Sequence, residues 1–279
     1  MDHEPVFPVD LEREIFETTA LMHPKIIPKL LLVARRIHIR IEPLLYRVLH
    51  LGIYDLMPDI FLTTTKTKPP GFFHGAVRQM YLESSISWSQ ADVQEVLSLC
   101  SGLVPLEIVG KFVNPRILRS LGQMRLQRLS VRLEALFGGN SCIDLTHPLF
   151  DSITHLDIYD EIGEKRILTR ISALPALTHL CFNEEVAWGI IRAVLRDCPR
   201  LELLANFCSF PGDVFRERAQ DPPVRDVRFV MGMYADHWID YDVGVKGLSD
   251  FWSVLDDFVA GKRSGAIPVD CYWCVTGTQ

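Results

Sequence analysis

A short pattern of apolar and polar positions recurs along most of the chain. Each copy has an apolar residue, two spacers, a leucine-like residue, one spacer and a final apolar residue. The starts of the copies lie 23 to 27 residues apart. This period is typical of stacked strand-plus-helix units, each of which buries its apolar face only against a neighbour. The copies begin at Val77, Leu103, Leu126, Ile153, Leu177, Leu201 and Val224.

The residues between the copies predict how the strands are joined. A helical stretch follows each strand pattern, most clearly at 186–195, and Gly or Pro ends it at junctions such as 100–103 and 198–201. Strand, helix and strand in succession favour right-handed crossovers between parallel strands. We therefore predict an α/β fold, a right-handed leucine-rich-repeat-like solenoid with one parallel sheet, and a further strand within 46–54 before the first copy.

The sixth copy leaves its strand register open. The pattern that starts at Leu201 puts polar Asn206 at an apolar position. An alternative register instead uses Leu203, Ala205 and Phe207. The two differ by one residue, and such a slip exchanges the core and solvent faces of a strand. Both registers for residues 201–208 stay open at this point.

The two ends of the chain differ from the repeats. Pro8 and nearby carboxylates open a helix whose apolar face carries Leu11 and Ile15, and a second helical stretch follows Pro28. We divide the chain into a helical head, residues 1–46, and an α/β region, residues 47–279. A terminal helix near 251–259 has its own apolar face, and we expect it to cap the exposed end of the core.

Alternation along each strand predicts a second, concave face of the sheet. Positions three, five and seven of each copy point away from the helices. Arg and Tyr are frequent anchors at protein interfaces, so this face is a candidate surface for a target protein; a merely solvated sheet face is the alternative. Two of its histidines occupy equivalent positions and would lie about 4.8 Å apart if their strands are adjacent. The candidate residues are Tyr81, Glu107, Arg128, Arg132, His155, Asp157, Tyr159, His179, Asn183 and Arg228.

Composition narrows the possible partners and the compartment. The chain has 279 residues and a net charge of -6, which argues against nucleic acid as a partner. No apolar run reaches the length of a membrane span. The polar first residues do not resemble a secretory signal, and seven scattered cysteines fit a reducing compartment. We expect a cytoplasmic or nuclear protein with neither a nucleic-acid nor a membrane partner.

No motif predicts catalysis or a cofactor. The sequence contains no nucleophile elbow, phosphate loop, dinucleotide fingerprint or His-Glu-x-x-His pair. Cys271 and Cys274 have the spacing of half a zinc or redox site, but they lack a second pair, so packing or loop cysteines are favoured. The acidic residues within 236–242 do not match a calcium loop. We therefore expect a protein that is not an enzyme and needs neither cofactor nor metal; the role of the two cysteines stays open.

The head resembles an F-box. Residues 7–16, Phe-Pro-Val-Asp-Leu-Glu-Arg-Glu-Ile-Phe, are similar to the family's Leu-Pro-x-Glu-Leu-x-x-x-Ile-Phe opening. Residues 32–36 are similar to its Leu-Val-Cys-Lys-Arg stretch, and residues 44–46 to its Leu-(Leu/Trp)-Tyr close. Residues 77–231 resemble irregular leucine-rich repeats, a common companion of the F-box. The whole chain resembles a group of uncharacterised fungal F-box-like proteins.

This resemblance implies a function. An F-box protein of this kind is a non-catalytic substrate-recognition subunit of a cullin–RING ubiquitin ligase: the head docks the ligase's adaptor subunit, and the repeats hold an unknown target protein. In this sequence Ile37 replaces the family's usual Trp, and the repeats lack the standard Asn ladder. The alternative is a stand-alone leucine-rich-repeat interaction scaffold whose head only caps the repeat stack. The residues implied for adaptor docking are Pro8, Leu11, Ile15, Leu32, Val33 and Ile37.

Overall fold

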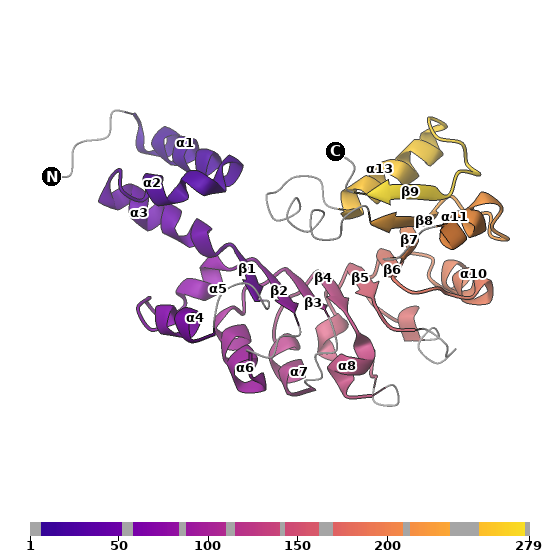
Figure 1. The fold of residues 1–279 in the computed structure, drawn as a ribbon, viewed down its shortest axis with the longest axis horizontal. Helices are drawn as coiled ribbons and strands as arrows, with labels where there is room; N and C mark the ends of the chain where they lie inside the picture. The colour runs from indigo at the N-terminus through magenta and orange to yellow at the C-terminus, as the bar shows by residue number, and fades with distance from the viewer. Residues whose placement is uncertain are drawn as a thin grey trace.

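A curved parallel sheet organises the molecule. The computed structural model describes residues 7–51, 58–83, 88–109, 115–139, 143–161, 170–208, 213–234 and 251–276. Within these residues nine strands form one sheet in sequence order, and every neighbouring pair is parallel (Figure 1). The predicted α/β class is confirmed, and the arrangement is consistent with a leucine-rich-repeat-like solenoid. The strands are β1 (Val48–Leu51), β2 (Gln79–Glu83), β3 (Pro105–Val109), β4 (Arg128–Val131), β5 (His155–Ile158), β6 (His179–Phe182), β7 (Leu203–Cys208), β8 (Phe229–Tyr234) and β9 (Trp273–Thr276).

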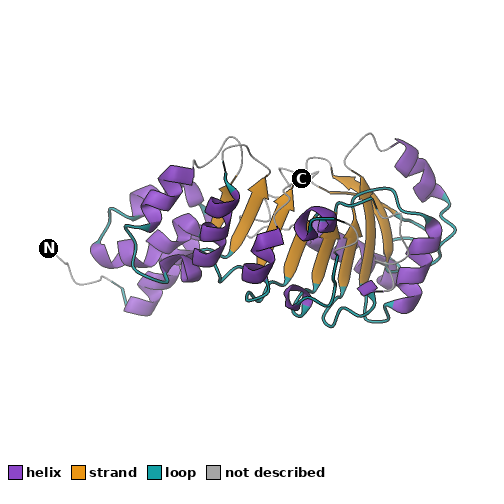
Figure 2. Cartoon of the chain, turned by 90° about the horizontal axis from the view of Figure 1, so that it is seen from below, coloured by secondary structure: helices purple, strands orange, loops and turns teal. Residues whose placement is uncertain are grey.

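Helices cover the convex face of the sheet. Figure 2 views the molecule from this side, with helices and loops in front of the strands. Short 3₁₀ helices, η3 (Pro115–Ile117) and η5 (Pro148–Phe150), take the place of longer helices in some connections. The α-helices of this layer are α4 (Pro58–Thr65), α5 (Phe72–Ala76), α6 (Gln90–Leu99), α7 (Leu118–Leu121), α8 (Leu133–Phe137), α10 (Trp188–Asp197) and α11 (Asp213–Gln220).

The repeated apolar positions form the core between these helices and the sheet. Leu106, Leu129, Leu156 and Leu180 are register partners on successive strands, and each is at most 1% exposed. Burial of such a side chain contributes about 1.5–3 kcal/mol before the entropy of ordering the chain is subtracted. A single strand cannot bury its own row, so the stack holds together through its neighbours.

Strand β7 settles the register that the sequence left open. Leu204 pairs with Leu180, and Asn206 pairs with Phe182, so the pattern that starts at Leu201 is the one that faces the convex core. Polar Asn206 is therefore buried in the core. Its side-chain amide donates to two backbone oxygens there, those of Phe182 (3.1 Å) and Glu184 (2.8 Å). A buried polar group is tolerated when it is hydrogen-bonded in this way.

Strand β8 corrects the position of the seventh copy. Phe229 pairs with Leu204, so the strand lies two residues later than the pattern starting at Val224 predicts. A local turn causes the delay: the Asp226 carboxylate accepts from the backbone N–H of Arg228 (2.9 Å), and the Asp226 carbonyl accepts from that of Phe229 (3.1 Å). Because the shift is two residues, the side chains keep their predicted faces.

The last strand, β9, is absent from the sequence prediction. Residues around Cys271 and Cys274 were expected to pack or to lie in a loop, yet Trp273–Thr276 pair in parallel with β8. The segment is only four residues long and carries no copy of the repeat pattern. Its place at the end of the sheet makes it an edge strand among the described residues.

The head packs around a small core of its own, built from Ala20, Ile27, Ile37 and Ile41. The Glu12 carboxylate of α1 accepts two hydrogen bonds of 2.9 Å from the Arg36 guanidinium of α3, which joins these two helices. Bidentate pairs of this kind fix orientation as well as distance. The elements are α1 (Val9–Met22), η1 (Pro24–Ile26), α2 (Ile27–Leu30), α3 (Arg35–Ile41) and η2 (Glu42–Tyr46).

We predict that Asn206→Ala destabilises the protein by about 1–3 kcal/mol, because it leaves the buried carbonyl of Phe182 and the partly buried carbonyl of Glu184 without their donor. Urea unfolding followed by far-UV circular dichroism measures this loss. Gln220→Ala, which removes an exposed amide on α11, is the matched control and should change stability little. Equal stability of the two variants would contradict a structural role for the Asn206 hydrogen bonds.

Candidate functional site

Most of the large apolar side chains that are exposed among the described residues belong to the head. The structure describes twelve exposed large apolar side chains, and ten of them belong to residues 7–45. The most exposed is Leu32, at 86%. Exposed apolar side chains gathered in one small unit mark an interaction site more often than scattered ones do. The ten are Phe7, Val9, Leu11, Ile15, Leu21, Met22, Leu32, Val33, Ile39 and Leu45.

Local geometry explains which residues implied for adaptor docking are accessible. Helical spacing puts Leu11 and Ile15 on one stripe of α1, away from the buried Glu12 and Ala20. Leu32 and Val33 lie in the turn between α2 and α3. Together with exposed Pro8, these four side chains form what we call the head surface. Ile37 differs, because it is fully buried in the core of the head and is not part of this surface.

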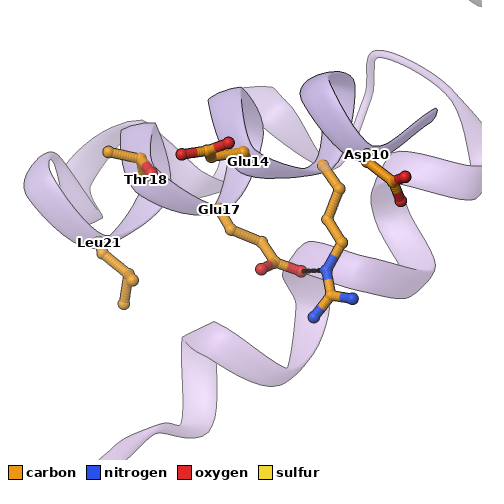
Figure 3. Close-up of a pocket in the computed structure, with 6 residues that line it drawn as sticks. Asp10, Glu14, Glu17, Thr18 and Leu21 are labelled. Carbon is orange, nitrogen blue, oxygen red and sulfur yellow. Dashed lines mark hydrogen bonds and ion pairs between the residues drawn. The ribbon is translucent and has the colours of Figure 1, made fainter. Parts of the chain in front are cut away.

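An acidic row runs along α1 beside that stripe. Asp10, Glu14 and Glu17 line a shallow depression of about 320 Å³, together with Arg13, Thr18 and Leu21 (Figure 3). The Arg13 guanidinium donates to the Glu17 carboxylate at 2.8 Å. All lining residues come from one helix and are largely solvated, so the depression offers charge at the edge of the head surface rather than an enclosed site.

On the concave face, the two equivalent histidines lie side by side as the repeat pattern predicts. His155 of β5 and His179 of β6 are register partners, and their rings stack with centroids 4.1 Å apart and planes 7° apart. The hydroxyls of Thr154 and Thr178 each lie 2.8 Å from Nδ1 of the following histidine. Both rings are therefore held in fixed orientations.

The terminal helix α13 (Phe251–Ser264) covers this pair. Trp252 contacts both rings edge-on, with centroids 5.1 Å from His155 and 5.8 Å from His179. The Asp256 carboxylate lies 2.8 Å from Nε2 of His179. The sequence predicted that this helix caps the end of the core; instead it lies against the inner side of the curved sheet (Figure 1).

The signal for this arrangement was the two-sided apolar pattern of β7. Leu203, Ala205 and Phe207 of the rejected register are fully buried, but on the concave face and under α13. A strand that is apolar on both sides is covered on both sides. Trp252 and Asp256 were not predicted as partners of the histidines, since they lie more than 70 residues along the chain.

Nine of the ten candidate target-binding residues consequently divide into two groups. Glu107, Arg128, Arg132, His155 and Tyr159 remain partly exposed and lie on β3 to β5 or directly after them. The second group, Tyr81, Asp157, His179 and Asn183, is buried.

Hydrogen bonds fix side chains within each of the two groups. The Asn183 amide donates to the Asp157 carboxylate, and the Tyr159 hydroxyl donates to Glu107 at 3.3 Å. Burial, with Asp157 nearby, raises the pKa of Tyr159 well above its usual value, so this hydroxyl keeps its proton. The Glu107–Tyr159 pair and the Asp157–Asn183 pair are therefore each held by a hydrogen bond of their own.

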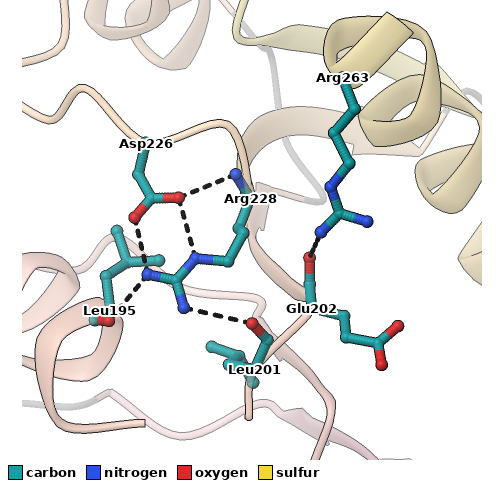
Figure 4. Close-up of polar contacts among 6 residues, drawn as sticks. All are labelled: Leu195, Leu201, Glu202, Asp226, Arg228 and Arg263. Carbon is teal, nitrogen blue, oxygen red and sulfur yellow. Dashed lines mark hydrogen bonds and ion pairs between the residues drawn. The ribbon is translucent and has the colours of Figure 1, made fainter. Parts of the chain in front are cut away.

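The last candidate, Arg228, is occupied inside the chain. Its guanidinium binds the Asp226 carboxylate (2.7 and 2.9 Å) and donates to the carbonyls of Leu195 (2.8 Å) and Leu201 (3.2 Å) (Figure 4). The hydrogen bond to Asp226 raises the pKa of Arg228, which keeps the charge in place. These bonds fasten the end of α10 to the strand edge, so we leave Arg228 out of the concave candidate surface.

The described residues offer little for metal chemistry. Their His, Cys, Asp and Glu side chains form no group of three or more that could hold a metal ion. Cys274 lies on β9 under α13, where burial raises the pKa of its thiol to about 11. The acidic residues 236–242 lie outside the described residues. Among the helices that the structure describes, none has the length and apolar character needed to cross a lipid bilayer.

Comparison with known proteins finds no match to this sequence, either among protein-family models or among curated proteins. The functional argument therefore rests on the head surface and on the concave face.

The histidine pair predicts a pH dependence of stability. Burial, and then the nearby His179 and Arg128, lower the pKa of His155 from 6.5 to about 3. A group whose pKa is lower in the folded state stabilises the fold above its unfolded pKa and loses that contribution as the pH falls toward the folded value. Between about pH 6.5 and 3, the free energy of unfolding should therefore fall less in His155→Phe than in wild type.

Urea unfolding at a series of pH values measures this difference. His74→Gln, which removes an exposed histidine, is the matched control. Identical pH profiles for wild type and His155→Phe would contradict the role assigned to the His155 ring.

Proposed function

We propose that this protein is a non-catalytic substrate-recognition subunit of a cullin–RING ubiquitin ligase, which acts in the cytoplasm or nucleus. In this proposal the head docks the adaptor subunit of the ligase, and the concave face binds the target protein. One observation carries the proposal: the concentration of exposed apolar side chains in a head whose sequence resembles an F-box.

The exposure pattern favours docking over a purely capping role. A head that served only as a cap would bury its apolar residues against the first repeat. Five of the six residues implied for docking are instead exposed, among them Leu11 at 44% and Val33 at 57%. Leaving such side chains in water forgoes about 25 cal/mol for each Å² of apolar area, which a docked partner would recover.

Contacts at the junction between the head and the sheet support the proposal that the two parts act together. The Lys68 ammonium donates to the Glu42 carboxylate at 2.6 Å. The Tyr46 ring at the end of η2 packs edge-on against Phe72 and Phe73 of α5, with centroids 5.6 and 5.2 Å away. These contacts hold the head in a fixed position on the first repeats. A fixed spacing between two bound partners raises their effective concentration, which is what ubiquitin transfer by proximity requires.

The partly exposed residues of β3 to β5 suit a protein target. Glu107, Arg128, Arg132 and Tyr159 offer both charges and an aromatic ring on three adjacent strands or directly after them. Arg and Tyr are enriched among the residues that dominate binding energy. In the alternative, a stand-alone scaffold, the same face binds the partner protein, and only the role of the head differs.

We predict that Leu11→Asp with Ile15→Asp weakens binding to the adaptor subunit at least tenfold, because two buried charges would replace apolar contacts in the complex. Copurification of the coexpressed full-length chain with the adaptor, followed by calorimetry, measures this. Ile60→Asp is the matched control, since Ile60 is also an exposed apolar residue of a helix, at 58%, but lies on α4.

The control should bind the adaptor like wild type, and both variants should keep the wild-type circular dichroism spectrum. The docking proposal would be contradicted if the wild-type protein did not bind the adaptor, or if the double variant bound it as well as wild type. Either result would favour the stand-alone scaffold.

A further inference from the structure

The helix α13 lies on a face of the sheet that the other layer of helices leaves open. The described helices that connect β1 to β8 cover the convex side, whereas α13 packs against the concave side of β6 to β9. The sheet nevertheless continues in the same direction from β8 to β9. A connection in the same direction over the opposite face has the opposite hand, and parallel crossovers of that hand are rare. Specific contacts between α13 and the concave face must therefore hold the helix in this position.

An apolar strip on the concave face provides these contacts. We define the strip as Cys181, Leu203, Ala205, Phe207 and Val230, each of which is fully buried under α13. Without the helix, these side chains would form a continuous apolar surface across β6 to β8. Such a surface on a sheet needs a cover.

The cover has the pattern of a peptide helix that binds a complementary surface. Trp252, Leu255 and Val259 face the strip with spacings of three and four residues, while Asp257 on the other side is exposed. Anchors at such spacings are the usual mode of helix recognition. The contact between Asp256 and His179 adds a polar anchor that fixes the position of the helix along the strip.

Chain topology allows this cover to leave. Among the described residues, β9 is the one element that follows α13, and it lies at the edge of the sheet that these residues form. Separation of residues 251–276 would leave the pairing of β1 to β8 intact and would uncover Tyr272, which packs against Phe229 in the convex core. Two hydrogen bonds to backbone oxygens hold the far end of α13, from Lys262 to Phe229 and from Arg263 to Glu202, each at 3.1 Å. A terminal unit of this kind opens more readily than the centre of a stack.

We propose that the apolar strip is a binding site for an amphipathic helix, and that α13 occupies it within the chain until a helix of the same pattern in the target replaces it. The partner helix carries an aromatic residue, a Leu three positions later and a Val four positions after that, with a carboxylate one turn beyond the aromatic residue. This inference deepens the proposed function, because it rests on the concave face being the target surface and gives α13 a self-inhibitory role there.

A peptide of residues 251–264 is the probe for the strip. The full-length Trp252→Ala, Leu255→Ala variant has a weakened internal helix, so it should bind the labelled peptide at least tenfold more tightly than wild type does in fluorescence anisotropy. Asp257→Asn, an exposed change on the same helix, should bind like wild type, and a scrambled peptide should bind to none of the proteins. Equal binding to the double variant and wild type, binding of the scrambled peptide, or a dimer that exchanges α13 between copies would overturn the proposal.

Hydrogen exchange on the wild-type chain is the second measurement and decides the matter even if the double variant does not fold. If α13 opens as a unit, its amides should exchange at least tenfold faster than those of α10 on the convex face. Exchange of α13 only together with α10 would overturn the proposal. Neither measurement involves the adaptor, so a failure here is distinguishable from a failure of adaptor binding.

Discussion

In-register pairing of parallel strands is the constraint on which the rest of the structure depends. Because Leu106, Leu129, Leu156 and Leu180 are direct partners, their side chains form one continuous row that the convex helices cover. The same register aligns His155 with His179 on the other face. A slip of one residue in any strand would exchange the two rows, burying charge and exposing leucine. Core and concave face are thus specified by a single set of backbone hydrogen bonds.

The sequence alone predicted the elements that this constraint controls. The repeated pattern identified the parallel sheet, the order of the repeat strands and, outside residues 201–208, the face of the side chains, because periodicity depends only on local geometry and burial. It also placed His155 beside His179. The seventh copy was misplaced by two residues, because Val224 and Val227 satisfy the pattern while the turn at Asp226 delays the strand. A shift of two residues keeps every side chain on the same face, so the apolar pattern fits both positions of the strand equally well.

What the sequence did not predict depends on contacts between distant segments. The position of α13 follows from Trp252 and Asp256 meeting the histidine pair and from the two-sided apolar character of β7. Strand β9 is short and lacks the pattern, so only its pairing with β8 identifies it. For the head, the resemblance implied six docking residues but could not separate Ile37, which fills the head's own core, from the five that face solvent. Packing decides which apolar residues are buried, and a sequence motif does not show this.

The inward return of α13 limits how a protein of this design can grow longer. An extra unit inserted between β1 and β4 would lengthen the array and leave the closed end untouched. An extra unit inserted between β5 and β8 would instead move Trp252 and Asp256 away from the two rings that they contact. Variation in repeat number among proteins with this closing helix should therefore be confined to the side nearer the head, while the last five strands, β5 to β9, stay constant in number and spacing.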